Sequence, residues 1–306
     1  MTSAVQLSDG ARVQVKILGD DDKKRPLLIA LHGAPGLSDH KEPESSFGFL
    51  ASDFRVLVYD ARGSGESDLK GPYTHERWVA DIEELRVWAG AERFSLAGGS
   101  YGGFVALEYA IAHPERLKAL VLRDTWAYGL RGVLNVLKNL LTSDRIQPDG
   151  DRQVRVWSGN VRDNQDFEDA WAEIVNIYQP KQGARISPAE KETRDEDKAQ
   201  KPKLRYQTHN FAFSFNQPRF DVRPRLKDIA VPTLVTTGRH DVIVPFEYGE
   251  EISRGIPQRR LVIFEHSGHS PPSDEPEAFR KTVKDFLLEW VLQPGEGRKE
   301  HEGNNP

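Results

Sequence analysis

The fold of this chain is decided by the stretch Arg93-Phe94-Ser95-Leu96-Ala97-Gly98-Gly99-Ser100-Tyr101-Gly102-Gly103. Residues 93–97 form a short apolar run that is typical of a buried strand, and residues 101–112 have the apolar face of a helix. A serine between glycines at a strand-to-helix junction indicates a sharp, strained turn. The glycines two positions away on each side prevent side-chain clashes, and the helix that follows offers backbone N–H groups to an oxyanion. Ser100 is therefore the candidate nucleophile.

Short apolar runs recur along the chain and alternate with helical patterns. The alternating residues 11–17 predict an edge strand, and residues 276–292 predict a final helix. Buried strands are predicted at 27–31, 55–59, 94–97, 119–122, 233–237 and 260–264. This order of strands and helices predicts an α/β fold, in which a mostly parallel sheet has helices on both faces.

The alternation stops near residue 125 and resumes near residue 225. We expect residues 1–125 and 225–294 to form one α/β core, and residues 126–224, which are helical and charged, to form an inserted helical cap. Within the cap, residues 182–203 are very polar and predict a mobile loop. Residues 295–306 are also polar and predict a disordered tail.

Composition excludes several classes of protein. The net charge of −5 over 306 residues, with both signs mixed, excludes a nucleic-acid partner. The chain has no cysteine, which excludes disulfides and thiolate catalysis, and its histidines lack ligand spacing, so we expect no metal and no cofactor. We also expect no membrane partner and a cytoplasmic location, because no run of 18 apolar residues and no signal-peptide core is present. The oligomeric state is left open.

A serine nucleophile needs a base and an acid that orients the base, and both follow predicted strands. Asp241 lies in the loop after residues 233–237, and His269 lies in the loop after residues 260–264. The carboxyl ends of parallel strands meet at one edge of the sheet, so these side chains should lie near Ser100. We therefore predict Ser100, Asp241 and His269 as the catalytic residues. Asp124, after another strand, is the rival acid.

The second group of N–H donors is expected in the segment His32-Gly33-Ala34-Pro35-Gly36, which follows the strand at 27–31. Proline has no N–H, so the predicted oxyanion donor of this loop is Ala34, with Gly33 as the alternative. The other predicted donor is the N–H of Tyr101. His32 is expected to shape the loop by packing and hydrogen bonding.

Together these motifs resemble the proline iminopeptidase-like branch of the α/β-hydrolase superfamily. The HGGPG motif of that branch reads His32-Gly33-Ala34-Pro35-Gly36 here, its D-x-R-G-x-G-x-S loop reads Asp60–Ser67, and its GGSWGG elbow has Tyr101 in place of tryptophan. The resemblance covers residues 10–125 and 225–292. It implies an α/β-hydrolase fold and a serine hydrolase that releases an N-terminal residue through an acyl-enzyme. The implied substrate is a small molecule or a short peptide.

The resemblance also suggests substrate-binding residues in the cap. In the peptidases, acidic cap residues bind the free amine of an N-terminal proline, and one of them lies in a Trp-Glu stretch that Trp171-Ala172-Glu173 resembles. Glu173, Trp171 and Phe211 are therefore the candidate substrate-binding residues. The chain departs from the family at Gln207-Thr208-His209-Asn210-Phe211, where the second carboxylate is missing. A carboxylesterase or lactonase is the alternative function, and a non-catalytic ligand-binding α/β-hydrolase fold is a more remote one.

Overall fold

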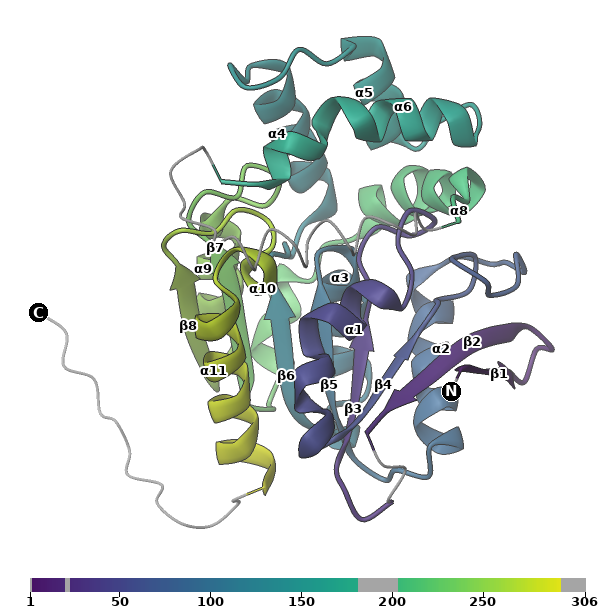
Figure 1. The fold of residues 1–306 in the computed structure, drawn as a ribbon, viewed down its shortest axis with the longest axis vertical. Coiled ribbons are helices and arrows are strands. Elements are labelled where there is room, and N and C mark those ends of the chain that lie inside the picture. Colours follow the sequence, from purple (N-terminus) through teal and green to yellow (C-terminus); the bar gives the residue numbers. More distant parts are fainter. Residues whose placement is uncertain (1, 20–22, 181–202, 293–306) are drawn as a thin grey trace, which may run out of the picture.

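An eight-stranded sheet organises the molecule in a computed structural model that describes residues 2–19, 23–180 and 203–292 (Figure 1). The strand order is β1-β2-β4-β3-β5-β6-β7-β8. Strands β3 to β8 are parallel to one another, and β2 is antiparallel to both of its neighbours. The strands span Thr2–Gln6 (β1), Arg12–Leu18 (β2), Leu27–Leu31 (β3), Arg55–Tyr59 (β4), Phe94–Gly99 (β5), Leu117–Arg123 (β6), Thr233–Gly238 (β7) and Arg259–Phe264 (β8).

The predicted edge strand at residues 11–17 is not at the edge. The structure places β2 second in the sheet, and β1 pairs with its outer side from Thr2↔Lys16 to Gln6↔Arg12. Sequence reasoning missed β1 because only one of its residues, Val5, is buried. A single buried position gives no alternating pattern that could be recognised.

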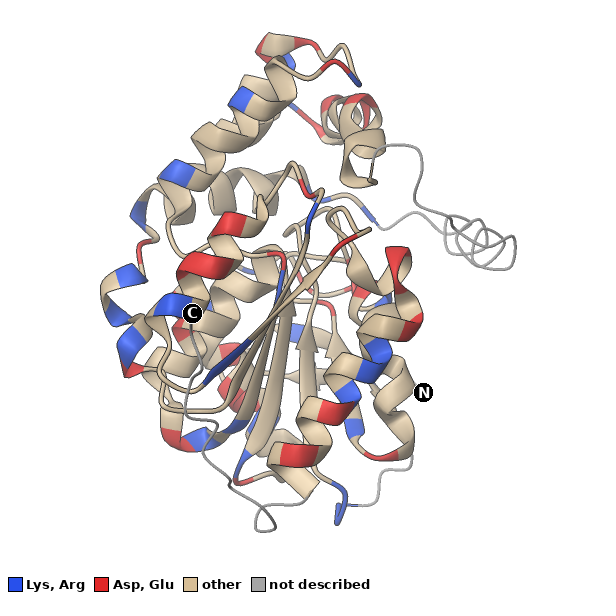
Figure 2. Ribbon diagram, turned by 90° about the vertical axis from the view of Figure 1, so that its left-hand side faces the viewer, with Lys and Arg blue, Asp and Glu red and all other residues tan. Residues whose placement is uncertain are grey.

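Helices cover both faces of the sheet, as the sequence predicted. Alternate residues of each strand point to opposite faces, so Leu28 and Ala30 belong to one apolar core while Leu27 and Ile29 belong to the other. The first core is completed by α1 (Lys41–Phe47) and α11 (Pro276–Leu287), and the second by α2 (His75–Trp88), α3 (Tyr101–Ala112) and α9 (Phe246–Gly255). Figure 2 shows acidic and basic residues interspersed on helices at both sides of the sheet.

Four helices from the region between β6 and β7 lie above the carboxyl ends of the strands (Figure 1). They are α4 (Gly129–Leu141), α5 (Gly150–Ser158), α6 (Asn164–Ile174) and α8 (Tyr206–Phe211). The two ends of this region meet at an isolated bridge between Tyr128 and Asp221. The predicted tail at 295–306, and all but the last residue of the predicted loop at 182–203, lie outside the described residues. The division into core and cap stays a prediction.

Side chains that accept hydrogen bonds from free backbone N–H groups fix where several helices begin. The Asp149 side chain accepts from the N–H of Arg152 at the start of α5, and the Asp163 side chain accepts from the N–H of Asp166 at the start of α6.

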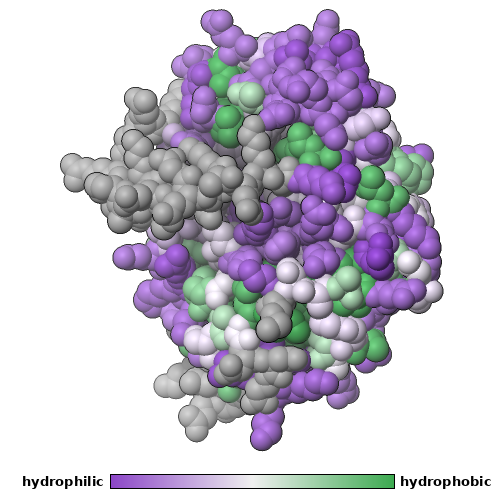
Figure 3. Space-filling view, turned by 45° about the vertical axis from the view of Figure 1, so that its right-hand side comes forward, coloured by the Kyte–Doolittle hydropathy of each residue, from purple (hydrophilic) through white to green (hydrophobic). Residues whose placement is uncertain are grey.

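Within the described residues, no helix is both long and apolar enough to cross a membrane. On the face drawn in Figure 3, hydrophobic side chains appear in small groups among hydrophilic ones.

Candidate active site

The backbone of Ser100 has the strained conformation that the glycine pattern predicts. Its φ is 51° and its ψ is −121°, at the junction of β5 and α3. The turn requires glycine on both sides, because a Cβ on Gly98 would overlap the carbonyl oxygen of Gly102 and a Cβ on Gly102 would lie 2.7 Å from the carbonyl oxygen of His32. The serine is thus held where α3 approaches the loop after β3.

Asp241 and His269 meet at the carboxyl edge of the sheet. The Nδ1 atom of His269 lies 2.7 Å from Oδ2 of Asp241, and both residues are buried. The other oxygen of Asp241 accepts hydrogen bonds from the N–H groups of Ile243 and Val244, at 2.8 and 2.9 Å. An ionised carboxylate can only accept, so we assign the imidazole proton to Nδ1, which leaves Nε2 of His269 free to accept a proton.

The charge of Asp241 tunes the basicity of His269. Burial alone would lower the pKa of His269, but the negative charge of Asp241 and the hydrogen bond between the two side chains outweigh it and raise that pKa above its usual 6.5. An imidazole with this partner readily takes up a proton, which is the property that a general base needs.

The rival acid, Asp124, has a different set of contacts. Its Oδ1 atom accepts the N–H of Gly238 at 2.9 Å. Its Oδ2 atom is buried, makes no hydrogen bond in the described part of the chain, and lies 3.5 Å from Nη1 of Arg123. Burial, together with the neighbouring charge of Asp241, raises the pKa of Asp124 far above its usual value. The hydrogen bond from Nδ1 of His269 goes to Asp241, and the protonated form of Asp124 is the favoured one.

Ser100 lies at the end of β5, within the same edge of the sheet as the loops that carry Asp241 and His269. Among the residues that the structure describes, no hydrogen bond joins Oγ of Ser100 to His269. Contacts of this kind are often long in a free enzyme and shorten when substrate binds. The catalytic roles of the three residues stay a prediction.

The loop after β3 lies directly against the serine. A Cβ on Gly33 would lie 3.2 Å from Cβ of Ser100, and Ala34 has a positive φ of 21°. The N–H groups of Ala34 and Tyr101 make no hydrogen bond with any described residue, whereas the N–H of Gly33 donates to Oε2 of Glu42 at 3.3 Å. The alternative donor is therefore occupied, and the two predicted donors are free to bind an oxyanion.

His32 holds this loop through both of its ring nitrogens. Nδ1 lies 2.6 Å from the carbonyl oxygen of Gly33, and Nε2 lies 3.1 Å from the backbone nitrogen of Ala61. Because the backbone N–H of Ala61 can only donate, we assign the ring proton to Nδ1, which donates to Gly33. His32 has the shaping role that the sequence predicted for it.

The side chain of Tyr178, which lies between β6 and β7 in the sequence, packs against His269. The ring of Tyr178 stands edge-on to the ring of His269, with centroids 5.1 Å apart, and its carbonyl oxygen accepts the N–H of His269 at 2.9 Å. Trp171 packs on Tyr178, with centroids 4.7 Å apart, so this predicted residue reaches the site through its neighbour. The sequence does not single out Tyr178, because spacing does not show which ring meets His269.

The other two candidate substrate-binding residues have partners of their own. Phe211 contacts the rings of Tyr73 and Phe215, at 6.0 and 4.9 Å between centroids. Glu173 forms an ion pair with Arg152, and its Oε2 atom also accepts hydrogen bonds from the Gln153 side chain at 2.8 Å and the backbone N–H of Asp149 at 3.2 Å. Both carboxylate oxygens of Glu173 are engaged between α5 and α6, which counts against a role in binding a substrate amine.

One group of side chains in the described residues has the spacing of metal ligands. It consists of Asp39, His40 and Asp60, whose candidate ligand atoms lie within 4.8 Å of one another. Nδ1 of His40 lies 2.7 Å from Asp60, which also accepts two backbone N–H groups. These hydrogen bonds account for the cluster without an ion.

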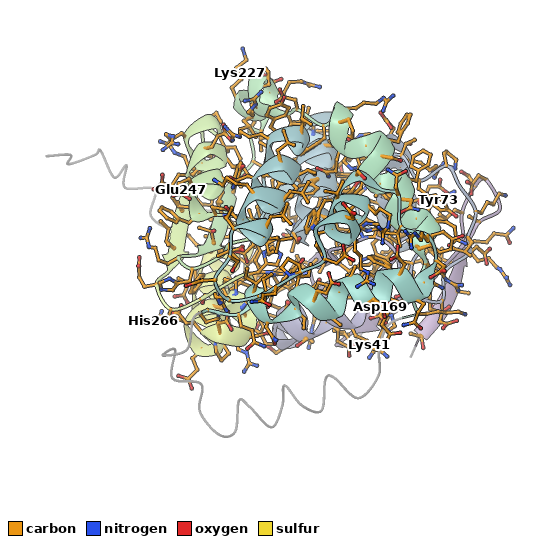
Figure 4. All side chains as sticks on the ribbon, turned by 90° about the horizontal axis from the view of Figure 1, so that it is seen from above. Lys41, Tyr73, Asp169, Lys227, Glu247 and His266 are labelled. Carbon is orange, nitrogen blue, oxygen red and sulfur yellow. The ribbon has the colours of Figure 1, made fainter. Side chains whose placement is uncertain are left out.

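His266, three residues before His269, is exposed and lies at the periphery of the molecule (Figure 4).

The fold and this site together define a known class of protein. Residues 26–276 match the family described as the alpha/beta hydrolase fold, so the chain belongs to that family. The predicted fold class is confirmed, and family membership supports an enzyme.

Similarity to individual proteins extends over nearly the whole chain. The proline iminopeptidase PfmaB of Pestalotiopsis fici is 29% identical over 91% of this chain and 97% of its own length. An esterase from Thermogutta terrifontis has a TM-score of 0.72 at 24% identity and covers 94% of this chain and 98% of its own. The enol-lactonase of Burkholderia xenovorans has a TM-score of 0.70 at 24% identity, with coverages of 94% and 100%. The predicted resemblance to proline iminopeptidases is confirmed, and the two structures support the fold.

Proposed function

We propose that this protein is a serine hydrolase that cleaves uncharged carboxylic esters, including lactones, through an acyl-enzyme on Ser100. The observation that carries the proposal is the 2.7 Å contact between His269 and Asp241 at the sheet edge where Ser100 has its strained conformation. Two unoccupied N–H groups beside the serine supply the electrostatic stabilisation that acyl transfer requires.

In the proposed mechanism, Oγ of Ser100 attacks the carbonyl carbon while Nε2 of His269 takes the hydroxyl proton. The N–H groups of Tyr101 and Ala34 bind the resulting oxyanion. As the tetrahedral intermediate collapses, the bond to the alcohol oxygen breaks and His269 gives that oxygen its proton. Water then attacks the acyl-enzyme, loses a proton to His269, and releases the acid as Ser100 regains its proton. Asp241 keeps the imidazole in the correct tautomer throughout.

The contacts of Glu173 favour an uncharged substrate. An ammonium group in a closed pocket loses its hydration and needs a carboxylate or several acceptors in return. The candidate carboxylate, Glu173, is already paired with Arg152. The second candidate function is release of an N-terminal residue from a short peptide, and the similarity to the Pestalotiopsis fici proline iminopeptidase over 91% of the chain favours it.

A hydrolysis panel separates the two functions. It contains p-nitrophenyl esters of short and long acids, several lactones, prolyl anilide and N-acetylprolyl anilide. We expect turnover of esters or lactones and no preference for the free amine. Cleavage of prolyl anilide at least roughly 100-fold faster than its acetylated form, lost in Glu173→Gln, would establish the aminopeptidase, since losing one partner of a buried charge pair has an effect of this size.

A labelling experiment separates both enzymes from a non-catalytic ligand-binding protein. A fluorophosphonate probe should modify the purified protein at Ser100 and should fail to modify Ser100→Ala, because only an activated serine reacts. Absence of labelling, together with no turnover across the panel, would favour the ligand-binding alternative.

A further inference from the structure

Behind the serine, a buried arginine links the loops of the site. Arg123, the last residue of β6, is 4% exposed. Its Nη1 atom donates to the carbonyl oxygen of His269 at 3.1 Å, and its Nη2 atom donates to Oε1 of Glu42 on α1. Its own carbonyl oxygen accepts the N–H of Ser100 at 2.8 Å. Arg123 thus contacts the elbow, the histidine loop and α1 at once.

Glu42 continues these contacts to the oxyanion loop. Its Oε2 atom accepts the N–H of Gly33 at 3.3 Å, and its Oε1 atom, which binds Arg123, also accepts the hydroxyl of Ser46 at 3.3 Å. The two side chains differ in exposure: the Glu42 side chain is 32% exposed, whereas that of Arg123 is 4% exposed. The charge of Arg123 is therefore largely shielded from water. Its hydrogen-bonded acidic partner is Glu42, and its Nη1 atom also lies 3.5 Å from Oδ2 of Asp124.

We propose that Glu42 and Arg123 are positioning residues. Together they fix the oxyanion loop, which is the segment His32–Gly36 after β3, relative to the histidine loop, which is the segment after β8 that carries His269. In addition, Arg123 neutralises the charge that Glu42 brings next to the oxyanion. This proposal deepens the proposed function, because it concerns the same oxyanion site. Neither residue has to touch substrate for the proposal to hold.

The first part of the proposal follows from hydrogen bonding. The loop has two candidate donors, Gly33 and Ala34, and Glu42 occupies the first of them. That leaves the N–H of Ala34, whose φ of 21° is a strained conformation for a residue with a side chain. A strained segment persists only when its surroundings hold it, and the Glu42 carboxylate is a fixed acceptor at the residue before Ala34.

The second part follows from charge. A carboxylate near the oxyanion site repels the negative charge that develops there, and this repulsion is strong where water is excluded. The guanidinium of Arg123 lies on the same carboxylate and cancels most of the repulsion. The acceptor that Gly33 needs can thus be present without the penalty of a net negative charge.

The two parts predict an unusual pattern among variants. Arg123→Met leaves the Glu42 charge uncompensated and should lower kcat roughly 100-fold, as loss of an oxyanion donor does, while KM changes no more than about threefold. Adding Glu42→Gln removes that charge but keeps an acceptor for Gly33, so the double variant should regain at least about tenfold in kcat. Glu42→Gln alone should have a small effect.

Glu42→Ala tests the positioning role when it is compared with Glu42→Gln: both variants take the carboxylate away from Arg123, but only Glu42→Gln keeps an acceptor for the Gly33 N–H. Glu42→Ala removes that acceptor, so we expect kcat and the affinity for a boronic acid transition-state analogue to fall together by about tenfold, with unchanged affinity for the carboxylic acid product. The matched control is Glu44→Gln on the same helix, whose carboxylate pairs with Lys16 away from the site; it should leave both quantities unchanged.

The experiment measures ester hydrolysis, analogue binding and thermal unfolding for the full chain and these variants, with Ser100→Ala alongside. A double variant no faster than Arg123→Met would overturn the charge argument. Glu42→Ala with normal kcat and analogue affinity would overturn the positioning argument, even if Arg123→Met failed to fold. Failure of the proposed function itself would appear separately, as an unmodified chain that shows no activity dependent on Ser100.

Discussion

Of two carboxylate–histidine–hydroxyl series, the first is the predicted series of Asp241, His269 and Ser100, in which the structure shows the contact between His269 and Asp241. The second comprises Glu108, His75 and Tyr101: Nδ1 of His75 lies 3.0 Å from Oε1 of Glu108, and Nε2 lies 2.9 Å from the hydroxyl of Tyr101. The same three kinds of group thus occur in the same order on either side of a single peptide bond.

The two series differ in what their hydroxyls contact. The hydroxyl of Tyr101 also lies 3.3 Å from the carbonyl oxygen of Ala212 and 3.3 Å from Nδ2 of Asn216, and burial raises the pKa of Tyr101 well above its usual value. The hydroxyl of Ser100 has no hydrogen-bond partner among the described residues. The presence of a carboxylate, an imidazole and a hydroxyl in this order is therefore not enough to make the hydroxyl reactive. Such a series also needs an uncommitted hydroxyl with free N–H donors beside it.

The largest effect should come from removing the first hydroxyl. Ser100→Ala should lower kcat by roughly 10⁴- to 10⁶-fold, because a triad acts as a unit and loses most of its effect with any member. Circular dichroism and thermal unfolding should match the unchanged protein. Turnover near the normal rate in a folded sample free of contaminating hydrolase would contradict the proposed mechanism.

The acid of the first series should have the next largest effect. Asp241→Asn should lower kcat by roughly 10⁴-fold, since an amide in this position favours the wrong imidazole tautomer. The matched control is Asp124→Asn, which replaces a carboxyl group whose protonated form is already favoured and should change kcat no more than about threefold. If Asp124→Asn proves damaging and Asp241→Asn harmless, the assignment of the acid is wrong.

The pH dependence of kcat/KM should report His269. The base acts in its neutral form, so activity should fall about tenfold for each pH unit below the pKa of His269 and level off above it. Because Asp241 raises this pKa, the midpoint should lie above 6.5. The residual activity of Asp241→Asn should show a lower midpoint, since the charge that stabilises the imidazolium is gone. A flat profile from pH 5 to 9, with chemistry rate-limiting, would exclude His269 as the base.

The second series should affect stability more than rate. Tyr101→Phe removes a buried hydroxyl and leaves His75 and Asn216 without that partner, so we expect a loss of about 1–3 kcal/mol in the free energy of unfolding. We expect kcat to stay within about fivefold, because the N–H of Tyr101 is unchanged. Denaturant titration and kinetics on one ester measure both. A drop of 10³-fold in kcat with unchanged stability would show that this series takes part in the chemistry.

The first series could be predicted from sequence and the second could not, for a physical reason. Ser100 follows β5 directly, Asp241 and His269 lie in the loops after β7 and β8, and the carboxyl ends of parallel strands always meet at one edge. The prediction that residues 260–264 form a buried strand was wrong in one respect, because β8 is the last strand of the sheet and only Phe264 in it is buried. His75 and Glu108 lie on two different helices, α2 and α3, and their meeting depends on how those helices pack, which leaves no local pattern.

The same distinction explains the remaining differences. The pairing of Glu173 with Arg152 depends on the contact between α5 and α6, and the contact of Tyr178 with His269 depends on the path of the chain above the sheet. Helix α1, which carries Glu42, spans only Lys41–Phe47 and is too short for a periodic apolar signal. Local patterns located most of the strands and the loops that carry Ser100, Asp241 and His269, while contacts between distant segments needed the structure.

The approach of Arg123 to Gly99 constrains the order in which this site can change during evolution. A Cβ on Gly99 would lie 2.1 Å from Nη2 of Arg123, so alanine at position 99 requires the guanidinium to leave its present contacts or the arginine to be replaced. Loss of the arginine first leaves Glu42 beside the serine with its charge uncompensated. The least costly route away from this arrangement therefore alters Glu42 before Arg123, and Arg123 before Gly99. The three positions are epistatic, and a library that varies them singly would score Arg123 and Gly99 as intolerant while missing viable combinations that begin with Glu42.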